Sequence, residues 1–92
     1  MKKKSIDTLK SEIRQLLPAT IRVSEFKHGN RVYMVYIAEV IPDAEAPTYE
    51  QKLLLHGLGA KGNFNLLSHS QAEAIITTAY RHNLRGRVMI SI

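Results

Sequence analysis

The stretch FKHGNRVYMVYIAEV, residues 26–40, most constrains how this chain can fold. Gly29 and Asn30 suit the two central positions of a β-hairpin loop, because glycine adopts positive φ without steric cost. The segment after the loop, residues 31–41, is rich in β-branched and aromatic side chains, which favour a strand. Because this strand is apolar on both faces, we expect it to lie at the centre of a sheet. One face then forms a core with helices, and the other needs a further helix, a partner or a ligand.

The hairpin loop also fixes which side chains share a face. With His28 opposite Arg31, every further pair follows, because side chains alternate along a strand. The face expected to pack on helices is apolar, with Ile21, Val23, Met34, Tyr36 and Ala38. The other face is half polar, with Arg22, Ser24, Phe26, Tyr33, Val35 and Ile37. Aromatic side chains stack on bases and cations contact phosphates, so this second face is a candidate binding platform. The alternative is that a helix or a second protomer covers it.

One helix is predicted before the hairpin and a second one after it. The first begins at Ser5, a good N-cap, and continues with apolar residues at helical spacing until Pro18 stops it. The second begins at Thr48, which has a glutamine three residues later at Gln51. This spacing predicts a capping box, in which each side chain bonds the other residue's backbone amide.

A third helix and a closing strand complete the fold. The helix is expected to start at Ser70, with Glu73 closing a capping box, and to end at Gly86. Its expected inner face consists of Ala72, Ile75, Ile76, Ala79 and Tyr80. Alternating apolar residues then predict a strand over residues 87–92, whereas residues 63–67 form either part of a loop or a short fourth strand. The sequence therefore predicts an α+β domain with a three- to four-stranded, mainly antiparallel sheet and three helices, in the order α-β-β-α-(β)-α-β.

Length and composition narrow the class of protein. The 92 residues suit one domain, with residues 1–4 as a flexible basic tail. The chain has no cysteine, which excludes disulfides and thiolate metal sites. No apolar run approaches a membrane span, and the basic start is not followed by the apolar core of a signal peptide. We therefore expect a cytoplasmic protein without a membrane partner.

The charge is basic and unevenly distributed. The net charge is +5 and the pI is about 9.8, whereas residues 39–50 hold four acids and no cation. A basic domain with clustered Lys and Arg has the electrostatic character of a nucleic-acid binder. The clusters lie at the hairpin and at RHNLRGR, residues 81–87. The candidate residues for binding nucleic acid or a partner are Arg22, Phe26, Lys27, Arg31, Tyr33, Lys61, Arg81, Arg85 and Arg87.

A search for catalytic or metal-binding patterns gives no candidate. The four histidines are scattered, and none has the spacing of a helical metal site. Ser68, His69 and Ser70 are adjacent, but adjacency in sequence does not make a nucleophile and its base. The sequence predicts no catalytic residue, metal, cofactor or small-molecule substrate, and hence a protein that is not an enzyme.

One glycine motif, Gly59-Ala60-Lys61-Gly62, has the form GxxG. Together with the predicted element order, it resembles the prokaryotic type II KH arrangement. That resemblance implies an RNA-binding domain whose GxxG loop joins two helices and clamps the nucleic-acid backbone. The sequence departs from the KH pattern, because NFNLLSH intervenes before the next helix and Asn65 occupies a position that is apolar in KH domains.

The leading hypothesis is a non-enzymatic binding module that acts on nucleic acid or a nucleoprotein complex. In its small size, basic charge and lack of motifs, the chain is similar to phage and mobile-element proteins that inhibit host nucleic-acid machines. Anti-CRISPR proteins are one such group. The alternative is a homodimerising interaction module. It would bury the apolar sheet face and the edge strand RVMISI, residues 87–92, against a second copy.

Overall fold

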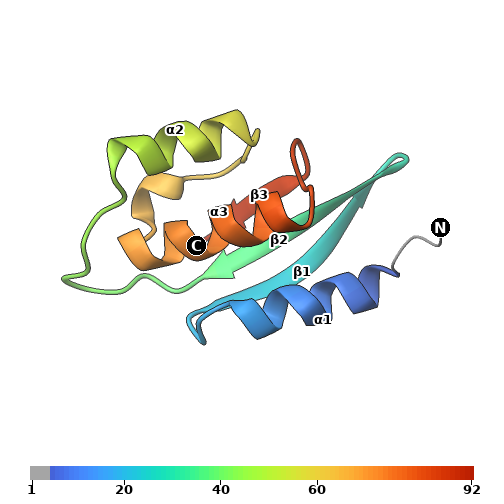
Figure 1. Ribbon diagram of the computed structural model, residues 1–92, viewed down its shortest axis with the longest axis horizontal. Coiled ribbons are helices and arrows are strands. Elements are labelled where there is room, and N and C mark those ends of the chain that lie inside the picture. The colour runs from blue at the N-terminus through green and yellow to red at the C-terminus, as the bar shows by residue number, and fades with distance from the viewer. Residues whose placement is uncertain (1–4) are drawn as a thin grey trace.

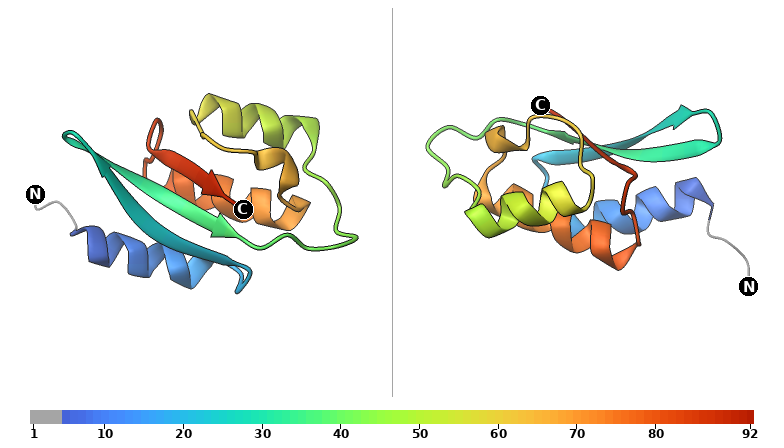
Figure 2. Two further views of the ribbon diagram at one scale, coloured as in Figure 1. Left: turned by 180° about the vertical axis from the view of Figure 1, so that it is seen from behind. Right: turned by 90° about the horizontal axis from the view of Figure 1, so that it is seen from above.

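The computed structural model describes residues 5–92 and shows two layers, a sheet and a set of helices that covers one of its faces (Figures 1 and 2). The elements are α1 (Ile6–Leu16), β1 (Ile21–His28), β2 (Arg31–Ala38), α2 (Tyr49–Gly57), the 3₁₀ turn η1 (Phe64–Leu66), α3 (His69–Arg81) and β3 (Val88–Ser91). This confirms the predicted α+β class and its three helices. The predicted basic tail, residues 1–4, lies outside the described residues.

The sheet has the order β1-β2-β3, with β2 in the centre as predicted. β1 and β2 pair antiparallel from His28–Arg31 to Ile21–Ala38, which is the predicted hairpin register. β3 runs parallel to β2, so the sheet is mixed. The parallel direction follows from the connection, because the chain leaves the far end of β2, crosses over through α2 and α3, and re-enters the sheet toward the end where β2 begins. Antiparallel pairing still dominates, with eight residue pairs against four.

Of the two alternatives for residues 63–67, the structure has the loop, and the optional fourth strand is absent there. Only Lys61 pairs with the outer edge of β3, where its N–H donates to the Val88 carbonyl at 3.1 Å and its carbonyl accepts from Ile90 N–H at 2.7 Å. Gly62 then has φ of +120°, which turns the chain away from the strand and into η1. A strand cannot continue through this backbone conformation, which is open to glycine.

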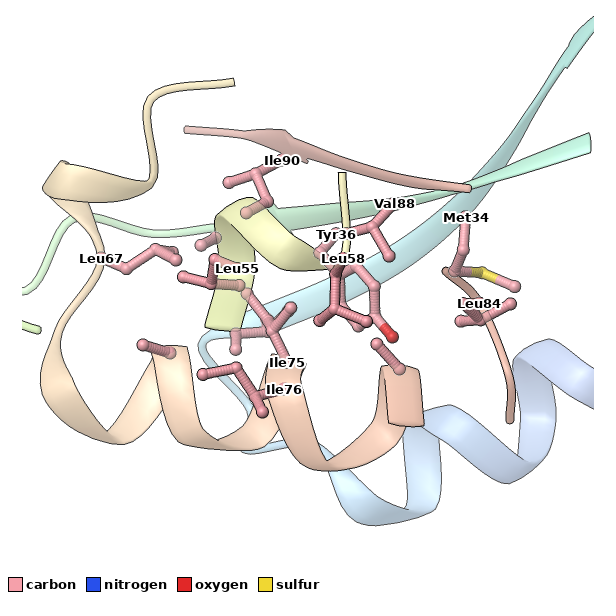
Figure 3. Close-up of a cluster of buried hydrophobic side chains, with 14 of the residues drawn as sticks. Met34, Tyr36, Leu55, Leu58, Leu67, Ile75, Ile76, Leu84, Val88 and Ile90 are labelled. Atoms are coloured by element: carbon pink, nitrogen blue, oxygen red, sulfur yellow. The ribbon is translucent and has the colours of Figure 1, made fainter. Parts of the chain in front are cut away.

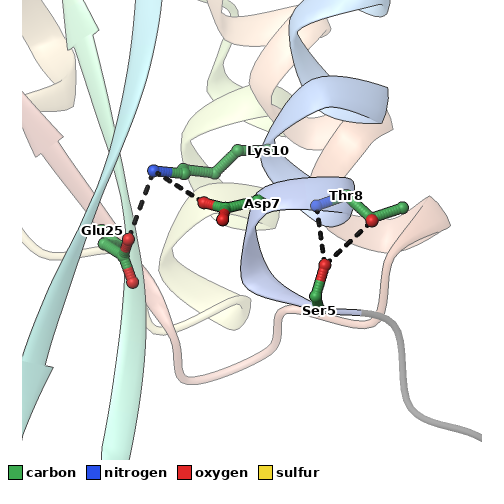
Figure 4. A network of polar contacts seen from close by, with 5 residues as sticks. All are labelled: Ser5, Asp7, Thr8, Lys10 and Glu25. Atoms are coloured by element: carbon green, nitrogen blue, oxygen red, sulfur yellow. Dashed lines mark hydrogen bonds and ion pairs between the residues drawn. The ribbon is translucent and has the colours of Figure 1, made fainter.

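α1 is fixed at its start and along one side (Figure 4). The Ser5 hydroxyl accepts a hydrogen bond from Thr8 N–H, which confirms Ser5 as the N-cap. Farther along, Lys10 Nζ lies 3.2 Å from the Glu25 carboxylate of β1 and 3.8 Å from that of Asp7. Glu25 therefore lies on the helix-covered face of the sheet.

α3 begins two residues earlier than predicted. Its N-cap is Ser68, whose hydroxyl accepts from Gln71 N–H, while the Gln71 side chain accepts from Ser68 N–H. The predicted capping box between Ser70 and Glu73 is therefore wrong. Gln71 is buried and also donates to the Glu39 carbonyl at 2.8 Å. This second bond joins α3 to the end of β2, and it needs the amide N–H group that the side chain of Gln71 has and that of Glu73 lacks.

The core lies between the sheet and the helices (Figure 3). Tyr36, Leu58 and Ile75 are among its fully buried side chains and lie close together between β2 and α3. Most of the predicted inner face of α3 is buried, but Tyr80 is 46% exposed, contrary to the prediction. Ala79 occupies the core side at this last turn, so Tyr80 points toward the flank of the helix layer.

Tyr36 is expected to make stability fall at high pH. Its hydroxyl lies 2.9 Å from Thr78 Oγ1, and the Thr78 hydroxyl donates to the Ala74 carbonyl, so Tyr36 is the donor of this pair. Burial raises the pKa of Tyr36 to about 12, although the hydrogen bond to Thr78 lowers it. Because the pKa is higher folded than unfolded, this stabilisation is complete below about pH 10 and is lost as pH rises through about 12.

The measurement is urea unfolding at about pH 9 and pH 11, between which Tyr36 should account for a loss of about 1 kcal/mol. Tyr36→Phe should not show this loss between the two pH values. At neutral pH its free energy of unfolding should be lower by about 1 kcal/mol, because the hydrogen bond to Thr78 is missing. Tyr49→Phe is the matched control, because Tyr49 is 74% exposed and should change neither quantity. An identical pH dependence in Tyr36→Phe and the unaltered protein would contradict the assignment.

Candidate functional site

The sheet face opposite the helices carries a row of three rings, of which Phe26 and His28 are exposed and Tyr33 is half-buried. Phe26 of β1 is paired with Tyr33 of β2, and their ring centroids lie 6.2 Å apart at an angle of 44°. On its other side, the Phe26 ring stacks with the His28 ring at 6.3 Å and 16°. Phe26 is 46% exposed, although a side chain of this kind is usually buried. The three rings therefore form a continuous aromatic surface that no helix covers.

Two residues from other parts of the chain complete this surface. Lys61 Nζ lies 5.7 Å from the centroid of the Tyr33 ring, within range of a cation–π contact. The backbone bridge between Lys61 and Met89 holds the lysine beside β3. Together the five side chains line a hollow of about 180 Å³. We call this surface the aromatic platform; it consists of Phe26, His28, Tyr33, Lys61 and Met89.

Further cations lie along the same sheet. Arg22 is exposed near the start of β1 and, by alternation, shares its face with Phe26. Arg31 is exposed at the start of β2, on the face of the aromatic platform. Arg87 directly precedes β3 and is exposed, and its carbonyl accepts a hydrogen bond from Met34 N–H at 2.8 Å. This bond places Arg87 beside β2 next to the platform.

The strands bring almost no negative charge to this face. Across β1, β2 and β3, all of which the structure describes, the one carboxylate is Glu25. It lies on the covered face and pairs with Lys10. Within residues 5–92, no salt bridge joins any of the candidate cations to a carboxylate. Within the described residues, the positive charge around the aromatic platform is therefore not neutralised by a salt bridge.

The remaining candidate cations lie elsewhere. Lys27 is exposed near the tip of the hairpin, on the strand face opposite to that of Phe26. Arg81 lines a hollow of about 350 Å³ between the ends of α1 and α3, and Arg85 lines a separate one of about 220 Å³ beside α2. Both arginines therefore belong to the helix layer. The structure does not gather all the candidate cations on one surface, because Lys27 lies on the other strand face and the two arginines line hollows among the helices.

The GxxG segment has a structural explanation. Gly59 has φ of +71°, and a side chain at Gly62 would run into the Ile90 carbonyl. The Lys61 amide is already bonded to β3, so it is not available to a phosphate. The segment leads into η1 instead of joining two consecutive α-helices directly. The element order implied by the KH resemblance is present, but the backbone of this loop is used to close the sheet edge.

His28 and Met89 belong to the aromatic platform but were not among the candidate residues. Alternation along β1 could have identified His28, because it shares the face of Phe26. Met89 is different, since its place beside Lys61 depends on how β3 meets a loop almost thirty residues away in the sequence. No local signal in the sequence marks that contact.

Comparisons with known proteins add no relative. No protein-family model, no curated protein and no solved structure matches this chain. In the part of the chain that the structure describes, no three His, Asp or Glu side chains are grouped so that they could hold a metal ion. None of the helices in residues 5–92 combines the length and apolarity needed to cross a bilayer.

Proposed function

We propose that this protein is a non-enzymatic module that binds single-stranded nucleic acid, free or within a nucleoprotein complex, on the open face of its sheet. The observation that carries the proposal is the aromatic platform. Its rings lie beside Lys61, on a face to which the strands contribute arginines and no carboxylate. This combination of stacking surface and positive charge is what single strands require.

The spacing of the rings favours a single strand over a duplex. Bases stacked on Phe26 and Tyr33 would be about as far apart as the two ring centroids, which is 6.2 Å. In duplex DNA, consecutive bases of one strand are separated by about 3.4 Å and stack on one another. A strand bound on both rings would therefore be extended, with its bases unstacked from each other. Such bases are accessible in single strands and loops but not inside a helix.

Salt dependence tests the electrostatic part of the proposal. Four cations lie on or beside the open face, namely Arg22, Arg31, Lys61 and Arg87. If each contacts one phosphate, log K for a single strand should fall with log salt at a slope of about −3. The measurement is fluorescence anisotropy with a labelled strand of about 12 nucleotides, from about 50 to about 300 mM salt.

Variants in the two layers provide the control for this titration. Arg22→Gln should reduce the slope by about 0.7, which is one phosphate contact on a single strand. Arg81→Gln removes the same charge from the helix layer and should leave the slope unchanged. Equal effects of the two variants, or equal affinity for a duplex of the same sequence, would contradict binding on the sheet face.

The proposal includes a role within a nucleoprotein complex, where the bound strand would belong to a larger assembly. Such a module could inhibit a phage host's nucleic-acid machine by occupying the path of the strand. An affinity pull-down from lysate, with and without nuclease, separates the two cases. Recovery of one protein assembly regardless of nuclease supports docking on a complex, whereas recovery of mixed nucleic acid supports direct binding.

A further inference from the structure

α2 has an apolar side that no other part of residues 5–92 covers. Its inner side, with Gln51 and Leu55, is buried against the rest of the helix layer. Tyr49, Leu53 and Gly57 follow one another at four-residue intervals and therefore lie on a common side of the helix. Tyr49 is 74% exposed and Leu53 is 51% exposed. Figure 1 shows α2 at the outer edge of the molecule, and a helix that is apolar on both sides usually has neighbours on both.

The presence of glycine at position 57 has no explanation within a single copy of the chain. It is the last residue of α2, its φ is not positive, and a methyl group in place of its hydrogen would meet no atom within 4 Å. Glycine in a helix is less favourable than alanine. Neither backbone conformation nor internal packing therefore requires glycine here. A second helix that approached α2 closely at this point would require it.

Acidic residues are grouped around the start of α2 and basic residues around its end, although Lys52 lies in the first turn beside Glu50. Glu50 lies in the first turn of α2, and Asp43 and Glu45 are exposed in the loop that precedes it. At the other end, His56 lies in the last turn, and Arg85 lines a hollow with Leu58, the C-cap residue. A second α2 packed antiparallel would place its acidic end against this basic end. Antiparallel packing also sets the two helix dipoles in a favourable orientation.

We propose that α2 is a self-association surface, on which two copies of this chain pair antiparallel about a two-fold axis that passes near Leu53. A contact of this kind must be complementary to itself, and the charge reversal along α2 meets that requirement. Counting from the axis, Tyr49 packs over the partner's Gly57 and Glu50 approaches the partner's His56. The missing side chain at Gly57 provides the space for the tyrosine ring.

A dimer through the outer edge of β3 has less support. Lys61 already bonds to Val88 and Ile90 on that edge, so a second chain would have to displace it. A pairing through α2 leaves the sheet unchanged, and the rings of the aromatic platform lie on the sheet face that the helices do not cover. The proposal is therefore independent of nucleic-acid binding. Since α2 has only nine residues, we expect a weak dimer whose population depends on concentration.

Substitution of Gly57 gives the sharpest test, because it should affect folding and association in opposite directions. Gly57→Ala should raise the melting temperature of the dilute monomer by about 4 °C, since alanine favours the helix. The same change should weaken self-association at least about tenfold, because the methyl group occupies the space of the partner's Tyr49. Sedimentation velocity over a range of concentrations measures the association.

Variants at other exposed leucines and at the charged ends give the controls. Leu53→Gln should weaken association at least about tenfold, whereas Leu16→Gln, at a leucine of similar exposure on α1, should leave it unchanged. Glu50→Lys should weaken it, and adding His56→Glu should restore it, which a parallel pairing would not do.

Covalent capture locates the axis. The sequence has no cysteine, so Leu53→Cys introduces a single thiol. A short bismaleimide should link two copies at this position but not through Leu16→Cys. Unaltered protein that remains monomeric at millimolar concentration would overturn the proposal and assign the exposed side of α2 to a different partner. Association that is insensitive to Gly57→Ala and Leu53→Gln would overturn it as well.

Discussion

Replacing Gly62 with alanine is expected to lower the free energy of unfolding by about 3 kcal/mol. Gly62 has φ of +120°, which a residue with a side chain rarely adopts. A Cβ at this position would also run into the backbone carbonyl of Ile90, which cannot move without moving β3. The variant must therefore distort β3 or release Lys61 from its edge. Urea or guanidinium unfolding measures the loss.

Gly29→Ala is the matched control. Gly29 also has positive φ, +60°, but a side chain there would meet nothing within 4 Å. The free energy of unfolding of this variant should fall only by the cost of holding alanine in the left-handed conformation, about 1 kcal/mol. If Gly62→Ala were as stable as Gly29→Ala and only lost nucleic-acid binding, the GxxG segment would act as a ligand loop and the structural explanation would be wrong.

Replacing Phe26 and Tyr33 together with alanine is expected to lower the affinity for a single strand by about 100-fold. Stacking of one base on an aromatic side chain contributes about 1–3 kcal/mol, and each 1.4 kcal/mol corresponds to a factor of ten. The fold should persist, because both side chains lie on the open face and outside the buried core. Anisotropy with the labelled strand measures the affinity, and circular dichroism checks that the fold is retained.

Tyr49 and Tyr80 provide the control for this double variant. Both are exposed tyrosines in the helix layer, and neither belongs to the aromatic platform. Their replacement with alanine should leave the affinity for the single strand unchanged. A double Phe26/Tyr33 variant that is folded and binds like the unaltered protein would contradict the proposed function, even if the salt dependence were as expected.

The elements that the sequence predicts correctly depend on interactions over a few residues. Gly29 and Asn30 define the hairpin loop, and alternation then sets the pair of Phe26 with Tyr33. Ser5 caps α1 for the same reason, since its partner amide is three residues away. A second example is α2, where Thr48 and Gln51 form the predicted capping box.

Local rules are insufficient where two choices are locally equivalent. Ser68 and Ser70 each have a polar side chain three residues later that can close a capping box. The tertiary structure selects Ser68, because Gln71 then also bonds to the Glu39 carbonyl. The same holds for residues 63–67, where apolar character suited a strand but the backbone of Gly62 turns the chain away.

By itself, the sequence determined the hairpin, its register and the α+β class, and it identified candidate cations without placing them in space. Only the tertiary structure decided that Lys61 and Met89 join Phe26 and Tyr33 in the aromatic platform, while Arg81 and Arg85 lie in the helix layer. The physical reason is the distance along the chain over which each kind of interaction acts. Turn conformation and side-chain alternation act between near neighbours, whereas the crossover through α2 and α3 brings together segments that have no local interaction to mark their contact.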